Sequence, residues 1–178
     1  MTITPVGLPG MYLIEPRWHG DERGRFGKVL AGAELAELGL EFELFDVNVG
    51  ETAAAGTIRG LHHQIEPHAE TKIFQCVSGG LFDVCVDVRA GSPTFGQWYG
   101  HELRPDTGAL FIPPGLSHGY QTLEPDTRAM YFTSTPWAPD HERGVRWNDP
   151  RVGIEWSRQP ADTITEKDQA WPDLEFPD

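Results

Sequence analysis

Residues 109–124, ALFIPPGLSHGYQTLE, decide the fold: a short apolar run ends at Pro113-Pro114-Gly115, and His118 follows three residues later. Similar β-forming runs recur about every ten residues, at 42–49, 71–77, 81–88, 95–103 and 128–135. Turns rich in Gly and Pro separate these runs, because Gly supplies positive φ and Pro presets φ. Short strands at this spacing predict a sandwich or a barrel.

The run 81–88, LFDVCVDV, shows how such a strand would pack. Side chains alternate between the two faces of a strand, so every second residue from Phe82 to Val88 gives an apolar face, and Asp83 and Asp87 make the other face more polar. Leu35 and Leu38, three residues apart, predict one short helix around 32–40. The chain after Pro136 is irregular, so it has to pack on another element to be ordered.

The composition limits the class of protein. A length of 178 residues predicts a single domain that spans residues 1–178. A content of 39% hydrophobic residues suffices for a packed core. A formal net charge of −13 repels phosphate backbones and anionic lipids, which disfavours nucleic acid and membrane partners. No signal segment or membrane span is visible, so we expect a cytoplasmic protein.

Two cysteines, Cys76 and Cys85, fall on runs predicted to be neighbouring strands. A disulfide between them is conceivable. Two buried thiols in a reducing cytosol are the better interpretation.

Two histidine segments indicate the type of barrel. The first, GTIRGLHHQ (56–64), places Arg59, His62 and His63 together, and the second is the Pro-x-Gly-x-x-His pattern that ends at His118. With a Gly-bearing hairpin between them, the pair is typical of the cupin barrel, a jelly roll whose cavity opens among such strands. We therefore expect an all-β chain, a cupin jelly-roll β-barrel with short peripheral helices.

The chain resembles the dTDP-4-dehydrorhamnose 3,5-epimerase family over nearly its full length. The matching segments are DERG (21–24), GTIRGLHHQ (56–64), AETK (69–72), FDVCVDVRAGSPTFGQW (82–98), IPPGLSHGYQTLE (112–124), Tyr131, ERGVRWNDP (142–150) and TEKD (165–168). The resemblance implies an isomerase of deoxysugar biosynthesis that inverts C3, C5 or both in a nucleotide-linked 4-keto-6-deoxyhexose. The family's pattern implies that the nucleotide is dTDP. It implies no metal and no organic cofactor.

The resemblance also implies a role for each matched residue. His62 would be the base. Asp168 would orient the imidazole and stabilise its positive charge. Lys72 would stabilise the enolate oxygen, and Tyr131 would return a proton from the opposite face. The residues expected around the nucleotide and the sugar are Arg23, Lys28, Asn48, Arg59, His118, Trp137, Glu142 and Lys167. Taken singly, lysines are more often solvated and a tyrosine in an apolar run is more often a core residue, so these assignments depend on the resemblance.

The chemistry is coherent without the family. A C4 ketone acidifies the C–H bonds at C3 and C5, and removing either proton places negative charge on the enolate oxygen. An imidazole, with an ordinary pKa near 6.5, can act as a base near neutral pH, and a carboxylate fixes its tautomer. A cation near the ketone oxygen opposes the developing charge, an effect often worth about 2.7–4 kcal/mol per preorganised donor. Inversion also needs a donor on the other face, which a tyrosine hydroxyl can supply.

Three departures from the family's pattern concern the nucleotide and the sugar. Lys28 stands where the family commonly has a Glu, Val47-Asn48-Val49 replaces Gln-Asp-Asn, and Trp137 replaces a Tyr that stacks on the base. The reaction type is therefore better determined than the base or the sugar. Relatives that epimerise only C3 or only C5 share most of these motifs, so the position stays open, with Tyr131 favouring C5.

Strand parity leaves one question about Arg59. It stands three residues before His62, so a regular strand would send the two side chains to opposite faces. Either the strand bulges near Gly60, or Arg59 works at the mouth of the pocket, in its own or a neighbouring subunit's site. The resemblance implies a homodimer in which the N-terminal segment pairs with the partner's sheet.

Two other functions fit part of the pattern. A metal-dependent cupin dioxygenase or isomerase would use His62 and His118 with Gln64, His68 or Glu70, but adjacent histidines followed by Gln form a poor triad. A non-catalytic cupin that binds sugar nucleotides would have no use for the proton-transfer group.

Overall fold

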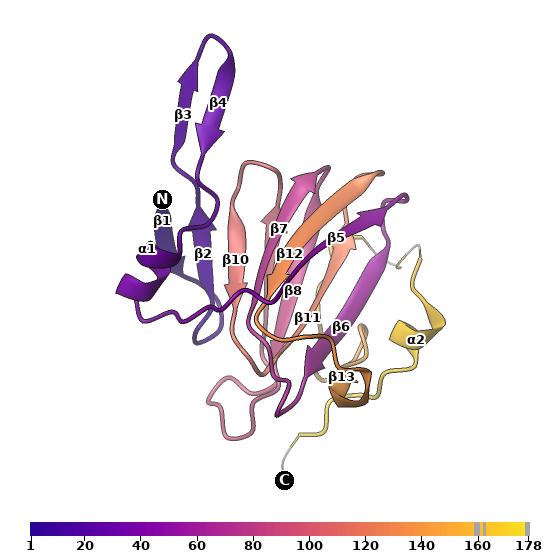
Figure 1. Cartoon of the computed structure of the whole chain (residues 1–178). Helices are drawn as coiled ribbons and strands as arrows, with labels where there is room; N and C mark the ends of the chain where they lie inside the picture. The colour runs from indigo at the N-terminus through magenta and orange to yellow at the C-terminus, as the bar shows by residue number, and fades with distance from the viewer. Residues whose placement is uncertain (159–160, 162, 177–178) are drawn as a thin grey trace.

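Two facing antiparallel sheets form the body of the computed structural model, which describes residues 1–158, 161 and 163–176 (Figure 1). Over these residues, the six-stranded sheet has the order β1 (Thr2–Pro5), β2 (Tyr12–Glu15), β10 (Ala109–Ile112), β7 (Lys72–Ser78), β12 (Thr127–Thr133) and β5 (Asp46–Thr52). The five-stranded sheet has the order β13 (Glu142–Gly144), β6 (Ile58–Gln64), β11 (Leu116–Thr122), β8 (Leu81–Asp87) and β9 (Trp98–Leu103). The expected all-β jelly-roll architecture is confirmed.

The peripheral elements are short, as expected. Strands β3 (Trp18–Asp21) and β4 (Gly24–Gly27) form a hairpin that projects from the body of the molecule as an arm (Figure 1). The helices are α1 (Gly32–Glu37), α2 (Glu166–Gln169) and a 3-10 turn, η1 (Pro139–His141). Among the described residues, no helix has the length and apolar character that a membrane crossing requires.

The predicted strands are present with shifted ends, and the largest shift is at 42–49, where β5 begins only at Asp46. The preceding chain follows α1 and uses its apolar side chains for packing. Leu40 and Phe42 lie against the cluster around Leu35 and Ile73. The apolar and polar residues of this segment alternate because every second side chain covers the core. The segment does not join a sheet.

Strand β8 is buried on both faces. Leu81 and Cys85 point into the core between the two sheets. Val84 and Val86 point to the outer face of the five-stranded sheet, where the chain after Pro136 covers them, with Val145 and Trp156 among the contacts. The C-terminal segment thus packs on this sheet, and the more polar face of β8 lies in the barrel interior.

The expectation that Cys76 and Cys85 lie on neighbouring strands is wrong. Cys76 is on β7 in one sheet and Cys85 is on β8 in the other, because the chain crosses between the sheets at the Gly79-Gly80 turn. Both thiols are buried and free, which confirms that they are not joined in a disulfide.

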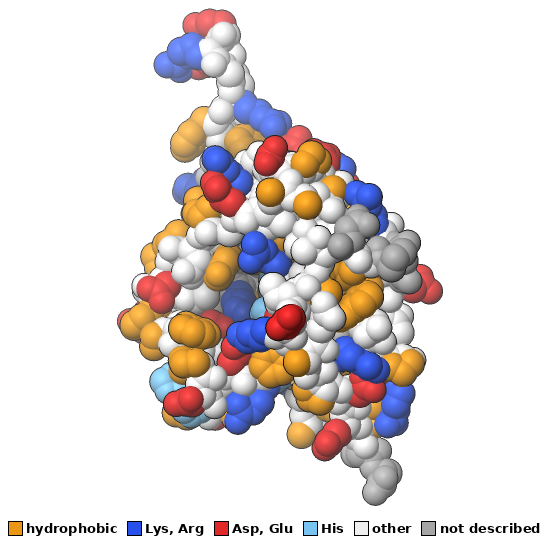
Figure 2. Space-filling model, turned by 90° about the vertical axis from the view of Figure 1, so that its right-hand side faces the viewer, with side chains coloured by type: hydrophobic (Ala, Val, Ile, Leu, Met, Phe, Trp, Pro, Cys, Tyr) orange, Lys and Arg blue, Asp and Glu red, His pale blue; other side chains and the backbone are white. Residues whose placement is uncertain are grey.

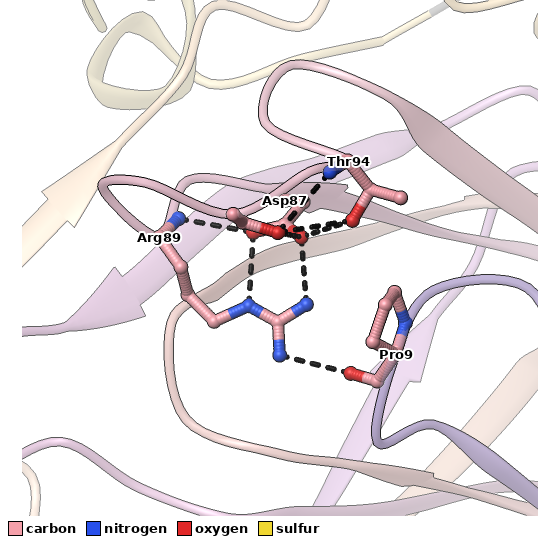
Figure 3. A network of polar contacts seen from close by, with 5 residues as sticks. Pro9, Asp87, Arg89 and Thr94 are labelled. Atoms are coloured by element: carbon pink, nitrogen blue, oxygen red, sulfur yellow. Dashed lines mark hydrogen bonds and ion pairs between the residues drawn. The ribbon is translucent and has the colours of Figure 1, made fainter.

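Asp87 fastens the end of the barrel through a buried network (Figure 3). Its carboxylate accepts hydrogen bonds from Arg89 (Nε, 2.9 Å; Nη2, 2.6 Å), Ser92 (Oγ, 2.6 Å) and Thr94 (Oγ1, 2.5 Å). Arg89 Nη1 also donates to the Pro9 carbonyl at 2.8 Å, which ties the loop after β8 to the N-terminal segment. Burial raises the pKa of Asp87, but these hydrogen bonds outweigh burial and hold it well below its usual range.

Candidate active site

The candidate active site is a pocket between the two sheets. Its outer part is a cavity of about 510 Å³ lined by Asp46, Asn48, His62, His63, Gln64, Glu70, Lys72, Tyr131, Thr133, Trp137, Glu142 and Lys167. Its inner part, about 200 Å³, shares His62, Lys72 and Tyr131 and adds Arg59, His118 and Asp168 among its lining residues. The side chains expected to move protons therefore lie where the two parts meet.

A carboxylate holds the imidazole of His62. His62 Nε2 lies 2.6 Å from Asp168 Oδ1, and Asp168 Oδ2 accepts a longer hydrogen bond from the Gly60 amide at 3.3 Å. Because a carboxylate only accepts, Nε2 carries a proton in this pair, which leaves Nδ1 free to take one from a substrate. The sequence separates the two residues by 106 positions, and the fold brings them together.

Helix α2 positions Asp168. Thr165 caps the helix by accepting a hydrogen bond from the Asp168 amide at 3.2 Å. Burial raises the pKa of Asp168, but the hydrogen bond and the charge of His62, with further hydrogen bonds from Gly60 and Thr165, outweigh burial and lower it. Asp168 is therefore ionised at neutral pH and can stabilise an imidazolium. The Trp171 ring, 6.1 Å from the His62 ring, packs edge-on beside it.

A β-bulge resolves the position of Arg59. Strand β11 pairs His118 with His62 and Tyr120 with Arg59, so the single residue between them on β11 lies opposite two residues of β6. Gly60, at φ +119°, lies in the bulge, and a Cβ there would stand 2.6 Å from Gly119 Cα. The extra residue brings Arg59 and His62 into one pocket of the same chain. Arg59 Nε donates to Thr52 Oγ1 at 3.1 Å.

The facing sheet supplies Lys72 and Tyr131. Lys72 Nζ lies 3.0 Å from Glu70, and both side chains are mostly buried. Tyr131 stacks on Phe74 with ring centroids 5.7 Å apart. Burial and the charge of Glu70 raise the pKa of Tyr131, against the opposing charge of Arg59. The phenol thus stays protonated at neutral pH and can donate a proton.

His118 lies in the inner pocket and is held by a carboxylate of its own. His118 Nε2 is 2.7 Å from Asp83 Oδ2, and the Phe74 ring lies 4.6 Å from the His118 ring. Asp83 thus fixes the orientation of a pocket residue. Asp83 Oδ1 is buried, and no donor within the described residues reaches it.

The mouth of the pocket combines an exposed aromatic ring with paired charges. The Trp137 residue is 67% exposed, so one ring face is open to a flat ligand. Glu142 and Lys167 form a close ion pair at the rim. Asn48 stands opposite Tyr131 on β5.

Two predicted residues lie elsewhere in this chain. Arg23 stands in the turn of the arm, where it is 83% exposed and pairs with Asp21 at 2.5 Å. Lys28 directly follows the arm and is exposed. Neither lines the pocket. The charged arm extends away from the body of the molecule (Figure 2).

Sequence reasoning gave Glu70 a role only in the metal-dependent alternative, and it gave Asp83 and Trp171 none. The signal available for Glu70 was its closeness in the sequence to Lys72, although it lies outside strand β7. No comparable signal existed for Asp83 or Trp171, because their partners lie on other elements. His63, to which the sequence analysis gives no role, has a buried Nδ1 without a partner among the described residues. Burial, with the charges of Lys72, Arg143 and His62, lowers its pKa to about 4.

A metal triad around His62 does not form. Within the described residues, the one group of three side chains with metal-binding geometry is Asp83, Cys85 and His118, which lacks His62. His68 packs instead against the His141 ring at 4.6 Å. The arrangement expected for a metal-dependent cupin enzyme is therefore not present in this part of the chain.

A larger cavity, about 690 Å³, lies between the C-terminal segment and the loop after β8. Its walls are mostly apolar, with Val88, Phe95 and Phe176 among them. It contains none of the expected proton-transfer residues, so the smaller pocket remains the candidate active site.

Comparison with known proteins gives a consistent result. Residues 5–175 match the family model described as dTDP-4-dehydrorhamnose 3,5-epimerase. A dTDP-4-dehydrorhamnose 3,5-epimerase of Sinorhizobium fredii is 42% identical over 175 residues, covering 98% of this chain and 90% of the relative.

Two solved structures extend this result. The epimerase of the same name from Bacillus anthracis, with TDP and PPi bound, is 39% identical with a TM-score of 0.91, over 97% of this chain and 99% of that one. ChmJ, a 3'-monoepimerase from Streptomyces bikiniensis in complex with dTDP-quinovose, is 32% identical with a TM-score of 0.89. The match covers 96% of this chain and 87% of ChmJ. On the family match over residues 5–175 and the near-complete coverage of these relatives, the chain belongs to the dTDP-4-dehydrorhamnose 3,5-epimerase family.

Proposed function

We propose that this protein is an epimerase of a nucleotide-linked 4-keto-6-deoxyhexose, with a dTDP-linked sugar as its substrate. The decisive observation is that His62 and Tyr131, the proposed base and acid, lie on facing sheets of one pocket. His62 belongs to β6 and Tyr131 to β12, and both line the inner cavity. A sugar ring between them would offer one face to the imidazole and the other to the phenol, as inversion requires.

The first step is proton removal. His62 Nδ1 takes the proton from C3 or C5, and the C–H electron pair forms the enolate double bond while charge moves to the C4 oxygen. Lys72 lines both parts of the pocket and would face this oxygen, where a preorganised donor often contributes about 2.7–4 kcal/mol. Asp168 stabilises the imidazolium that forms.

The second step is protonation from the opposite side. The Tyr131 hydroxyl gives its proton to the carbon, and the enolate electrons return to form the new C–H bond. The phenolate is then reprotonated by solvent, and His62 releases its proton to solvent. The product therefore contains a hydrogen from water, which makes isotope exchange the natural assay.

The site supports a nucleotide diphosphate at its outer end. In the outer part, Trp137 offers an exposed ring for stacking and Lys167 supplies a local cation on a chain of net charge −13. Arg59 supplies a further cation in the inner part. The relative with TDP bound and the relative with dTDP-quinovose bound both favour a thymidine nucleotide.

We also infer a homodimer in which the arm reaches the pocket of a second copy. Arg23 and Lys28 then belong to the partner's nucleotide site, which explains why neither lines its own pocket. Phe26 on the arm is 73% exposed, and Val49 on the edge strand β5 is 57% exposed, so both offer apolar surface to another chain. The two buried thiols suit the reducing cytoplasm.

The test is exchange in D₂O. Incubation with dTDP-4-keto-6-deoxyglucose should place deuterium at C3, C5 or both, and His62→Ala should abolish the exchange while the thermal transition stays intact. Absence of exchange with dTDP-linked and other nucleotide-linked forms of the sugar would refute the proposal. The position of the label decides between C3, C5 and double epimerisation.

A further inference from the structure

Three buried side chains with metal-binding atoms meet next to the inner part of the pocket, which only His118 of the three lines. Cys85 and His118 stand directly opposite each other on the antiparallel strands β8 and β11. Asp83 lies two residues before Cys85 and therefore on the same face of β8. One ligand atom from each residue lies within 4.8 Å of the other two, and all three residues are buried.

One carboxylate oxygen of the cluster is buried without a hydrogen-bond donor. His118 Nε2 engages Asp83 Oδ2 at 2.7 Å, but Asp83 Oδ1 has no donor among the described residues, although Asp83 is only 1% exposed. A buried acceptor left without a partner destabilises the fold, and more so when it is charged. A cation between the three side chains would remove this cost.

We propose that Asp83, Cys85 and His118 bind a thiophilic divalent cation of the Zn²⁺ type. One thiolate, one imidazole nitrogen and one carboxylate oxygen are three ligands that Zn²⁺ accepts in a tetrahedral site. Mg²⁺ and Ca²⁺ prefer oxygen ligands throughout, so a buried thiol selects against them. His118 lines the inner cavity, so the proposed site adjoins the pocket through this one ligand.

The geometry allows this with small movements. Zn–S and Zn–N distances of about 2.3 and 2.0 Å place the ligand atoms of a tetrahedral site about 3.3–3.8 Å apart. His118 Nε2 and Asp83 Oδ2, 2.7 Å apart, have to separate by roughly 0.6 Å, and atoms that start as far apart as 4.8 Å have to approach by roughly 1–1.5 Å, which side-chain rotation can supply.

Cation binding changes two protons. The Cys85 thiol loses its proton to solvent, and the His118 ring gives up the proton at Nε2 and takes one at Nδ1, so it stays neutral. Burial and the charge of Asp83 hold the pKa of Cys85 well above its usual range, against the opposing charge of Lys72. The thiolate therefore forms when the cation takes it.

The bound cation would remove His118 from contact with a sugar. Cation and substrate would then exclude each other, so the cation would act as a competitive inhibitor. This consequence rests on the proposed function, whereas cation binding itself does not.

Co²⁺ provides a direct probe, because a tetrahedral Co²⁺–thiolate site has a charge-transfer band that oxygen and nitrogen ligands do not produce. We expect the reduced protein to develop this band with one equivalent of Co²⁺, and Zn²⁺ to abolish it. The matched pair of variants is Cys85→Ala and Cys76→Ala. Cys76 is also buried but lies on the other sheet, with Sγ 3.2 Å from the Ser78 carbonyl.

The band should persist in Cys76→Ala and disappear in Cys85→Ala. Absence of the band in the wild type, or its persistence in Cys85→Ala, would overturn the site. If Cys85→Ala does not fold, as judged by its thermal transition, Cys85→Ser takes its place, because it keeps the side-chain shape without the thiolate.

Inhibition is measured separately. In the D₂O exchange assay, Zn²⁺ should raise KM for the wild type and Cys76→Ala at unchanged kcat, and should leave KM of Cys85→Ala unchanged. Equal inhibition of all three proteins would refute the competition. The Co²⁺ spectrum needs no substrate, so it reports on the site even if no nucleotide sugar is turned over.

Discussion

Replacement of Asp168 by Asn tests the central pair of the site without changing its size. Asp168 accepts from His62 Nε2 on one oxygen and from the Gly60 amide on the other. An Asn can present only one acceptor oxygen. If its amide NH₂ faces Gly60, two donors meet; if it faces His62, Nε2 becomes an acceptor and the ring proton moves to Nδ1, the atom that has to act as the base.

The magnitude follows from this geometry. Loss of a hydrogen bond to a charged group costs about 1.5–3 kcal/mol. This is about 10- to 150-fold in rate, at 1.36 kcal/mol per factor of ten. The wrong tautomer adds to this loss, and the corresponding change in a serine hydrolase triad lowers kcat by about 10⁴. We therefore expect kcat to fall by at least about 10-fold and at most about 10⁴-fold.

The assay is the initial rate of deuterium incorporation in D₂O, measured with the thermal transition of each variant. The matched control is Asp173→Asn, which removes an exposed carboxylate of the same C-terminal segment, paired with Arg146 at 2.7 Å. A surface pair contributes about 0–1 kcal/mol, so the control should keep nearly full activity. An Asp168→Asn enzyme as active as the control would refute the assignment of His62 and Asp168 as a catalytic pair.

Further predictions test the opposite wall, the bulge, the barrel end and the arm. Tyr131→Phe should slow inversion more than exchange, because His62 can still return deuterium to its own face; equal slowing of both would contradict a one-sided acid. Gly60→Ala should lower the unfolding free energy by about 1–3 kcal/mol and activity further, because φ is +119° and a Cβ would meet Gly119; a variant as stable and active as the wild type would show that the bulge tolerates a side chain. Asp87→Asn should cost about 2–4 kcal/mol in urea unfolding at neutral pH, since it breaks a buried charged network. Because the folded pKa of Asp87 is lowered, its stabilisation is present above its ordinary pKa of about 4 and is lost as pH falls below it; the wild type should therefore lose more stability on acidification than the variant, and parallel pH profiles would argue against this role. Arg23→Ala should raise KM with little change in kcat if the arm contacts nucleotide, and light scattering should show a dimer; a monomer with an unchanged KM would refute the arm's role.

Local sequence determined the strands and the motifs. Alternation along 71–77 and 81–88 and the Gly- and Pro-rich turns between the runs act between near neighbours, so strand positions could be read directly. The same holds for the two histidine segments, which pair across β6 and β11 at His62 and His118. Family resemblance then named Asp168, Lys72 and Tyr131, which composition and spacing alone could not have separated from ordinary surface and core residues.

Only the tertiary structure decided which of these side chains meet. The sequence could not choose between a bulge at Gly60 and a role for Arg59 at the mouth, because a bulge depends on the register of β11 against β6. It placed Cys76 and Cys85 on neighbouring strands, whereas the chain crosses to the other sheet between them. The pairing of Asp83 with His118 and the docking of α2 beside His62 join residues 35 and 106 positions apart. Such contacts depend on how whole sheets and the C-terminal segment pack, and a pattern of near neighbours does not contain that information.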